Sequence, residues 1–172
     1  GITPPVTWAE FADTAKKLHA ADPNVFLTDA PFGANADWVN GLLWQMGWKP
    51  VTRDGDKLVI NINDKISKDF AAYWQDLITA GVIETKPGFN NEWYTGLDSG
   101  RYATWLTAGW GPVFLTSVAK TSGGQWRAAD LPQWDAMNLG GFQRPAWFLQ
   151  AELASGRPGR AQRFKGQFRL ER

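Results

Sequence analysis

The sequence predicts an α/β domain in which helices pack on a sheet of short strands. Segments with the helical spacing of apolar residues alternate with short apolar runs, and Gly, Pro, Asn or Asp separate them. The length of 172 residues suits one domain of ordinary size. Because ligands of α/β sheets bind where strands end, we expect a site in the loops that follow the predicted strands.

The first part of the chain predicts a helix, a short strand and a loop. Thr7 and Glu10 have the spacing of a capping box, which predicts a helix over residues 8–19. Residues 25–27 form a short apolar run and predict a strand. The run leads into "TDAPFGANAD", residues 28–37, a loop rich in Pro, Gly and small polar residues. Loops of this kind commonly carry sites.

The middle of the chain predicts two helices around a hairpin. Asp37 can cap a second helix over residues 37–46, and the "DG" at residues 54–55 predicts a hairpin between two extended runs. Apolar residues then recur at helical spacing over residues 65–80, which predicts a third helix. Trp74 lies on the apolar stripe of this helix, so we expect it in the core.

The last predicted elements surround one tryptophan, Trp110. Helices are predicted over residues 91–99 and 112–119, with a strand over residues 102–108 between them. Residues 125–134 contain the last clear strand. Trp110 therefore stands where a strand stops and a helix begins.

Glycines flank Trp110 on both sides. Such glycines clear space around an indole ring and allow turns that other residues resist. One interpretation is a stacking platform at the mouth of a pocket. The other is a Trp that closes the edge of the sheet, and the sequence leaves both open.

Tryptophan is unusually frequent, with eleven residues in the chain. Most of these side chains must lie in the core. Indole rings with Asn and Asp nearby are also typical of sugar recognition, because a pyranose offers an apolar C–H face for stacking and hydroxyls for hydrogen bonds.

Charge and rare residue types exclude several kinds of chemistry. The net charge of +1 favours neither nucleic acid nor an acidic substrate as a partner. The absence of Cys removes thiolate sites, and the single His19 leaves no zinc site or catalytic triad. We therefore expect no metal, no other cofactor and no catalytic residue. We also expect no membrane span, because no apolar run approaches roughly 18 residues, and no export signal in this chain, because "GITPPVTW" lacks a charged n-region and an apolar h-region.

Five segments occur in a distinctive order: "PPVTWAEFADTAKKLHAADPNVFL", "DWVNGLLWQMG", "DGDKLVININDKISKDFAAYWQDLITAGVI", "NNEWYTGLDSGRYATWLTAGWGPVFL" and "WRAADLPQW". This ordered set resembles the extracellular solute-binding proteins of ABC-type sugar importers, the family 1 or maltose-binding-like group. The resemblance covers about residues 4–141.

The resemblance implies a type II periplasmic-binding-protein-like fold, in which two α/β lobes joined by a hinge close on a sugar. Residues 1–141 would then be a fragment, the second lobe of a longer protein. The resemblance also implies non-enzymatic capture of a sugar or oligosaccharide, with the permease subunits of an ABC importer as partners. It implies an extracytoplasmic location, in the periplasm or as a cell-surface lipoprotein.

The resemblance further implies which residues line the cleft between the lobes. The candidate ligand-binding residues are Trp110, Gly111, Phe32, Trp38, Asp29 and Asp37. Trp110 would stack on the sugar, and Phe32 or Trp38 would support it. Asp29 or Asp37 would accept hydroxyl protons.

Residues 142–172 depart from this pattern. They contain seven Lys or Arg and two Glu, net +5, whereas residues 1–141 have a net charge of −4. A basic tail that contacts nucleic acid or a membrane is one interpretation, and a foreign or out-of-frame end is the other. The absence of an aromatic-basic binding motif favours the second, so no nucleic-acid partner is expected. Residues 145–156 also fit a helix that covers apolar surface.

Two other functions stay open at this point. A glycoside hydrolase or a carbohydrate-binding module would use the same aromatic residues, although a hydrolase also needs two carboxyl groups about 5 to 10 Å apart in a cleft. The remaining alternative is a fragment without ligand activity.

Overall fold

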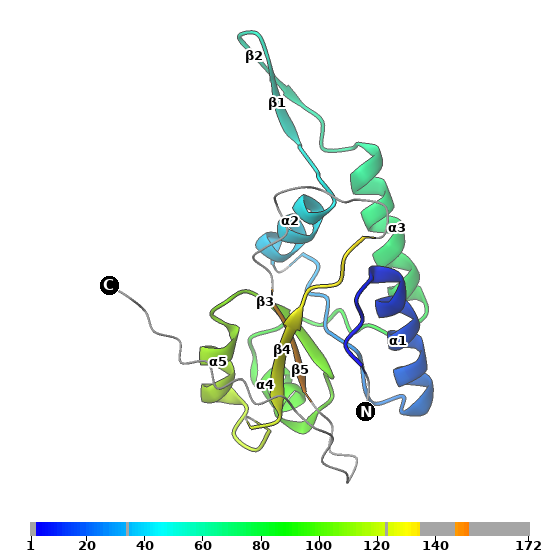
Figure 1. Ribbon diagram of the computed structural model, residues 1–172, viewed down its shortest axis with the longest axis vertical. Helices are drawn as coiled ribbons and strands as arrows, with labels where there is room; N and C mark the ends of the chain where they lie inside the picture. The colour runs from blue at the N-terminus through cyan, green and yellow to red at the C-terminus, as the bar shows by residue number, and fades with distance from the viewer. Residues whose placement is uncertain (1–2, 34, 123, 135–146, 152–172) are drawn as a thin grey trace, which may run out of the picture.

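The computed structural model describes residues 3–33, 35–122, 124–134 and 147–151. Figure 1 shows helices arranged around small sheets, and the predicted α/β class is confirmed. The helices are α1 (Trp8–Ala21), α2 (Ala36–Gln45), α3 (Lys65–Thr79), α4 (Asn91–Ser99) and α5 (Gly111–Val118). The strands are β1 (Val51–Asp54), β2 (Lys57–Ile60), β3 (Thr104–Thr107), β4 (Trp126–Asp130) and β5 (Trp147–Ala151).

Local signals in the sequence explain where the helices lie. The predicted capping box of α1 is confirmed, with the Glu10 N–H donating to Thr7 Oγ1 over 3.1 Å and the Glu10 carboxylate accepting from the Thr7 N–H. The predicted cap of α2 is wrong. Asn35 caps this helix in place of Asp37, because the helix begins one residue earlier and the Trp38 N–H then donates to Asn35 Oδ1 over 3.0 Å.

The segment that was predicted as the first strand pairs more briefly than expected. It forms a single parallel bridge between Phe26 and Tyr102, and the chain then changes partner, because Asp29 bridges to Glu84. Neither pairing is long enough for a strand ladder. The two bridges nevertheless hold Asp29 in place at the start of the loop that precedes α2.

The strand β5 lies in the middle of a three-stranded antiparallel sheet of order β3-β5-β4. The prediction of a helix over residues 145–156 is therefore wrong for the described stretch 147–151. The aromatic and aliphatic residues of β5 suit a strand that is paired on both sides. Residues 135–146 and 152–172 lie outside the described residues, so the division into a domain over 1–141 and a tail over 142–172 stays a prediction.

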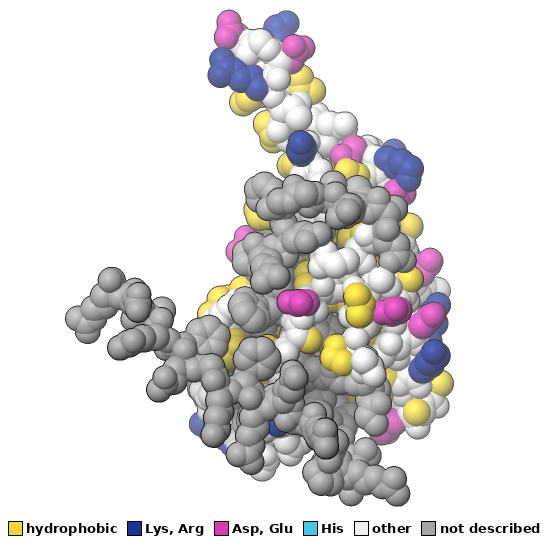
Figure 2. All heavy atoms as spheres, in the orientation of Figure 1, with side chains coloured by type: hydrophobic (Ala, Val, Ile, Leu, Met, Phe, Trp, Pro, Cys, Tyr) yellow, Lys and Arg dark blue, Asp and Glu magenta, His cyan; other side chains and the backbone are white. Residues whose placement is uncertain are grey.

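The hairpin β1–β2 projects from the rest of the molecule (Figure 1). Gly55 has a φ of 58°, which a tight hairpin turn requires. Every residue of both strands is exposed. Figure 2 shows charged side chains at the tip of the hairpin and hydrophobic side chains along its length.

Two clusters of aromatic side chains organise the interior. The core cluster surrounds Trp74, which is 1% exposed, where α1, α3 and the loop before α2 meet. Its aromatic members are Trp8, Phe11, Phe32, Trp38, Trp48, Phe70, Tyr73, Trp74 and Trp134. The rim cluster joins the turn before α4 to β3 and α5, and its members are Phe89, Trp93, Trp105, Trp110 and Phe114. In the described part of the chain, no helix has the length and apolarity needed to cross a membrane.

Candidate functional site

A pocket of about 250 Å³ lies between the loop that precedes α2 and the turn from β3 to α5. Residues from the stretch 29–42 form one wall, residues from the stretch 105–110 form the other, and Gly88 and Phe89 close one side. The volume is just below the range of about 300–1,000 Å³ that is usual for ligand pockets. It therefore suits a small ligand or one part of a larger ligand.

Trp110 stands at the rim of this pocket with 50% of its surface exposed. It is the N-cap residue of α5 but makes no side-chain cap hydrogen bond. Its ring contacts Trp105 with the centroids 5.4 Å apart and Phe114 with the centroids 5.9 Å apart, both nearly edge-on. The indole is thus supported by other rings on one side and open on the other, which supports the interpretation as a platform at a pocket mouth.

The glycines beside Trp110 do not act as predicted. Neither Gly109 nor Gly111 has a positive φ. We expected the two glycines to leave space around the indole. This expectation is wrong for the stretch of chain that carries Trp110, because Trp105 and Phe114 both contact the indole ring. Phe114 reaches the indole because residues four apart are neighbours on a helix. Gly111 is buried as the first residue of α5 and is not among the described residues that line the pocket.

Asp29 forms a buried polar part of the pocket wall, with 3% of its surface exposed. The Nε1–H of Trp93 donates to its Oδ2 over 2.9 Å. Burial raises the pKa of Asp29 to about 6 against the opposing effect of the Trp93 hydrogen bond, and the nearby charge of Glu84 adds to the rise. Above that pH, Asp29 is a carboxylate that can accept a hydrogen bond from a ligand hydroxyl.

The other predicted residues of this region take different places. Trp38 and Asp37 line the pocket, whereas Phe32 is not one of the described lining residues. Phe32 contacts Trp38 edge-on with the centroids 5.3 Å apart, and Trp38 also packs on Trp74 at 5.1 Å. Phe32 therefore supports Trp38 from within the core cluster. Asp37 lies exposed in the first turn of α2, where a ligand can reach its carboxylate.

Several residues that line the pocket were not predicted from the sequence. Phe89 is 48% exposed, and its ring centroid lies 6.2 Å from that of Trp110. Its φ of 59° lies in the left-handed region, which costs an L-residue about 1–2 kcal/mol. The turn signal in "KPGFNN" could have directed attention to it. Trp105, Asn35 and Thr107 also line the pocket, and no sequence pattern singled them out.

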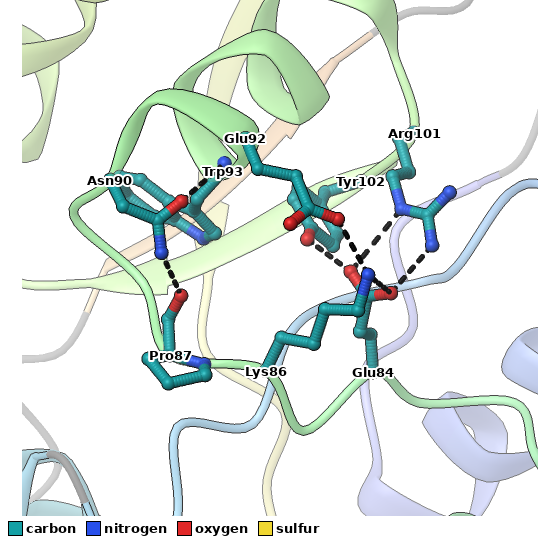
Figure 3. Close-up of polar contacts among 8 residues, drawn as sticks. All are labelled: Glu84, Lys86, Pro87, Asn90, Glu92, Trp93, Arg101 and Tyr102. Carbon is teal, nitrogen blue, oxygen red and sulfur yellow. Dashed lines mark hydrogen bonds and ion pairs between the residues drawn. The ribbon is translucent and has the colours of Figure 1, made fainter.

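A polar network centred on the buried Glu84 joins this carboxylate to Arg101 and Tyr102 (Figure 3). Arg101 donates two hydrogen bonds to the Glu84 carboxylate, over 2.5 and 3.2 Å, and the Tyr102 hydroxyl donates to the same carboxylate. Burial alone would raise the pKa of Glu84, but the hydrogen bonds from Arg101 and Tyr102 outweigh it and lower the pKa. Glu84 is therefore a fixed anion at neutral pH.

The charges of the pocket disfavour an anionic ligand. The described lining residues include two carboxylates, Asp29 and Asp37, and no Lys, Arg or His. Within the same described stretches, no group of three His, Cys, Asp or Glu residues could hold a metal ion. Aromatic rings beside carboxylate acceptors are the chemistry that a pyranose requires.

Comparison with solved structures places this fold among the solute-binding proteins of ABC transporters. The ABC transporter associated binding protein from B. animalis subsp. lactis Bl-04, solved in complex with β-1,6-galactobiose, matches with a TM-score of 0.68 and 27% identity, over 87% of this chain and 37% of its own. The galacto-N-biose-/lacto-N-biose I-binding protein of the ABC transporter from Bifidobacterium longum, in complex with lacto-N-biose, matches with a TM-score of 0.68 and 22% identity, over 88% of this chain and 37% of its own.

These matches confirm the resemblance that the order of sequence segments indicated, and with it the expected fold class. The chain spans little more than a third of the length of the proteins it matches, 37% in both cases. No protein-family model matches the chain, and a comparison with curated protein sequences gives no match.

Proposed function

We propose that this chain binds a sugar or oligosaccharide in the pocket beside Trp110, as part of a non-enzymatic capture protein of an ABC importer. The observation that carries the proposal is the pairing of a half-exposed indole with the buried acceptor Asp29 in one pocket. The fold shared with two sugar-binding proteins supports it. Permease subunits as partners and an extracytoplasmic location are parts of the same proposal.

In the proposed complex, each residue has a distinct task. Trp110 stacks on the apolar face of a sugar ring, and Trp105 and Phe114 hold the indole in place. Asp29 and Asp37 accept hydrogen bonds from hydroxyls, the first from inside the pocket and the second from its exposed edge. Trp38, backed by Phe32, forms the opposite apolar wall.

Calorimetric titration of the full chain tests this proposal. The ligands are galactose, β-1,6-galactobiose and lacto-N-biose, with galacturonic acid as the charged control. We expect saturable binding of at least one neutral sugar and weaker binding of galacturonic acid, because the pocket walls carry two carboxylates and no basic side chain among the described residues. Flat titrations with all three neutral sugars would contradict the proposal and favour a chain without ligand activity.

A hydrolase is the second candidate, and one observation favours it. Asp29 is a buried carboxyl group with a pKa raised to about 6, as a general acid requires. Its hydrogen bond to the Trp93 indole instead suits a fixed acceptor. Release of reducing sugar from the two disaccharides would support the hydrolase, and we expect none.

A further inference from the structure

We infer that Phe89 is a second sugar-stacking surface and that, together with Trp110, it makes the site select saccharides of at least two rings. This inference rests on the proposed sugar binding. Phe89 lines the same pocket as Trp110, and the two rings are 48% and 50% exposed. Both are therefore open to a ligand that reaches the pocket.

The geometry of the two rings decides how a ligand can use them. Their centroids lie 6.2 Å apart with the ring planes 38° from parallel. This is a direct aromatic contact, for which the usual range is about 4.5–7 Å, so a sugar ring does not fit between them. In the proposed arrangement, the two rings instead act as adjoining stacking surfaces. One pyranose on Trp110 leaves the face of Phe89 for the next unit of the chain.

Neighbouring contacts hold the turn that presents Phe89 (Figure 3). Asn90 Nδ2 donates to the Pro87 carbonyl over 2.8 Å, and Asn90 Oδ1 accepts from the Trp93 N–H over 3.0 Å as the cap of α4. Across the turn, Lys86 pairs with Glu92 over 2.5 Å. The backbone on both sides of Phe89 is thus fixed by side chains.

Folding alone does not explain the place of this ring. A phenylalanine with a φ of 59° is strained, and almost half of the Phe89 surface stays exposed. Glycine would adopt the same backbone without strain. Strain kept by surrounding structure is a feature of binding sites, and here the strained residue places its ring centroid 6.2 Å from that of Trp110.

The competing explanation is that Phe89 serves only as packing. Its ring contacts Trp93 with the centroids 4.9 Å apart and Phe114 at 5.6 Å, so it also covers part of the rim cluster. If Phe89 serves only as packing, its replacement lowers stability and changes the affinity for all ligands by the same factor. A stacking role changes the affinity for a disaccharide more than the affinity for its monosaccharide.

Calorimetric titration of the full chain with galactose and β-1,6-galactobiose separates the two roles. We expect the wild type to bind the disaccharide more tightly. Phe89→Ala should weaken the binding of the disaccharide by about three- to tenfold and change the affinity for the monosaccharide by less than about twofold. Phe89→Tyr, which keeps the aromatic face, should restore the wild-type ratio, and Trp110→Ala should weaken both ligands.

A variant with a similar side-chain volume separates a loss of binding from a loss of folding. Phe89→Leu retains apolar packing against Trp93 but lacks the flat face, so it should bind like Phe89→Ala while its thermal midpoint stays close to that of the wild type. If the wild type binds neither sugar, the proposed sugar binding fails. If the wild type binds both and the Phe89 variants leave the ratio of the two affinities unchanged, the inference about Phe89 is overturned.

Discussion

The core cluster and the rim cluster are built from the same residue types, but water reaches them differently. Trp74, at the centre of the core cluster, is 1% exposed, and Trp110 of the rim cluster is 50% exposed. Both rings contact several other aromatic rings. The number of aromatic contacts therefore does not separate a structural tryptophan from one that is available to a ligand.

The difference between the clusters follows from the elements that carry them. Trp74 lies in the middle of α3, whose apolar stripe faces α1 and the loop before α2. Trp110 lies at the first turn of α5, where the chain leaves β3, and half of its surface stays exposed although Trp105 and Phe89 contact its ring. A ring at the junction of a strand and a helix can be held on one side and left open on the other.

The largest effect is expected at Trp74. Trp74→Ala removes a fully buried indole and should lower the free energy of unfolding by about 3 to 5 kcal/mol. Chemical denaturation followed by circular dichroism measures this. Trp74→Phe is the matched control, and it should cost less, because the Trp74 Nε1–H has no hydrogen-bond partner in the described structure and its loss exposes no unpaired group. Equal costs for the two variants would contradict a tightly packed core cluster.

The next effect concerns the sheet that supports the rim cluster. Trp105 lies on β3, and β3 pairs with β5. Deleting residues 147–172 removes β5, and a loss of only three net hydrogen bonds would cost about 3 kcal/mol, or roughly 6–12 °C in the thermal midpoint. Deleting residues 152–172 keeps β5 and should lower the midpoint by less than about 4 °C. Equal midpoints for the two deletions would show that β5 contributes nothing to the domain.

A third prediction separates stability from binding within the pocket. Asp29 has a pKa of about 6 in the folded chain against 3.8 for an ordinary Asp. Between pH 4 and 6 the folded chain therefore holds a proton that the unfolded chain has lost, and stability falls as the pH rises. Above pH 6, ionised Asp29 lowers the free energy of unfolding by its full amount, about 3 kcal/mol.

Asp29→Asn should remove this cost and still accept the Trp93 hydrogen bond through its amide oxygen. The variant should match the wild type near pH 4 and have the higher thermal midpoint at pH 7, while its sugar affinity falls. Asp13→Asn, the same change at an exposed position of α1, is the control for the loss of one carboxylate. A difference in midpoint that does not grow between pH 4 and 7 would contradict the assignment of a raised pKa to Asp29.

The smallest effect is expected at Asp37. Its carboxylate is exposed at the edge of the pocket, so Asp37→Asn should weaken sugar binding by only about two- to fivefold. Stability should change by less than about 0.5 kcal/mol, because the residue neither caps α2 nor lies in the core. Titration calorimetry and a thermal melt measure the two quantities. A loss of binding as large as that of Asp29→Asn would place Asp37 inside the pocket in the bound state.

The sequence predicted what depends on local signals and missed what depends on tertiary contacts. The capping box at Thr7 and the apolar stripe through Trp74 lie within one helix each, so α1 and α3 could be placed to within two residues. The strand over residues 25–27 was predicted too long, because its two partners come from distant parts of the chain. No local pattern marks where a strand changes partner.

The candidate site shows the same division. Trp110 could be found because a strand, a glycine pair and a helix start meet in consecutive residues. Phe89 could not be assigned a role, because its position beside Trp110 depends on the packing of two segments that are far apart in sequence. Its left-handed backbone is also unexpected for an aromatic residue.

The central claim is that Trp110 binds a ligand and that Trp74 stabilises the fold. The most direct test measures sugar affinity by titration calorimetry and the thermal midpoint for Trp110→Ala beside Trp74→Ala. Trp110→Ala should weaken sugar binding by about 1 to 3 kcal/mol, a tenfold to hundredfold rise in Kd, with a smaller loss of stability than Trp74→Ala. If Trp110→Ala unfolds the chain as severely as Trp74→Ala, or leaves the affinity unchanged, then Trp110 is a packing residue and the account is wrong.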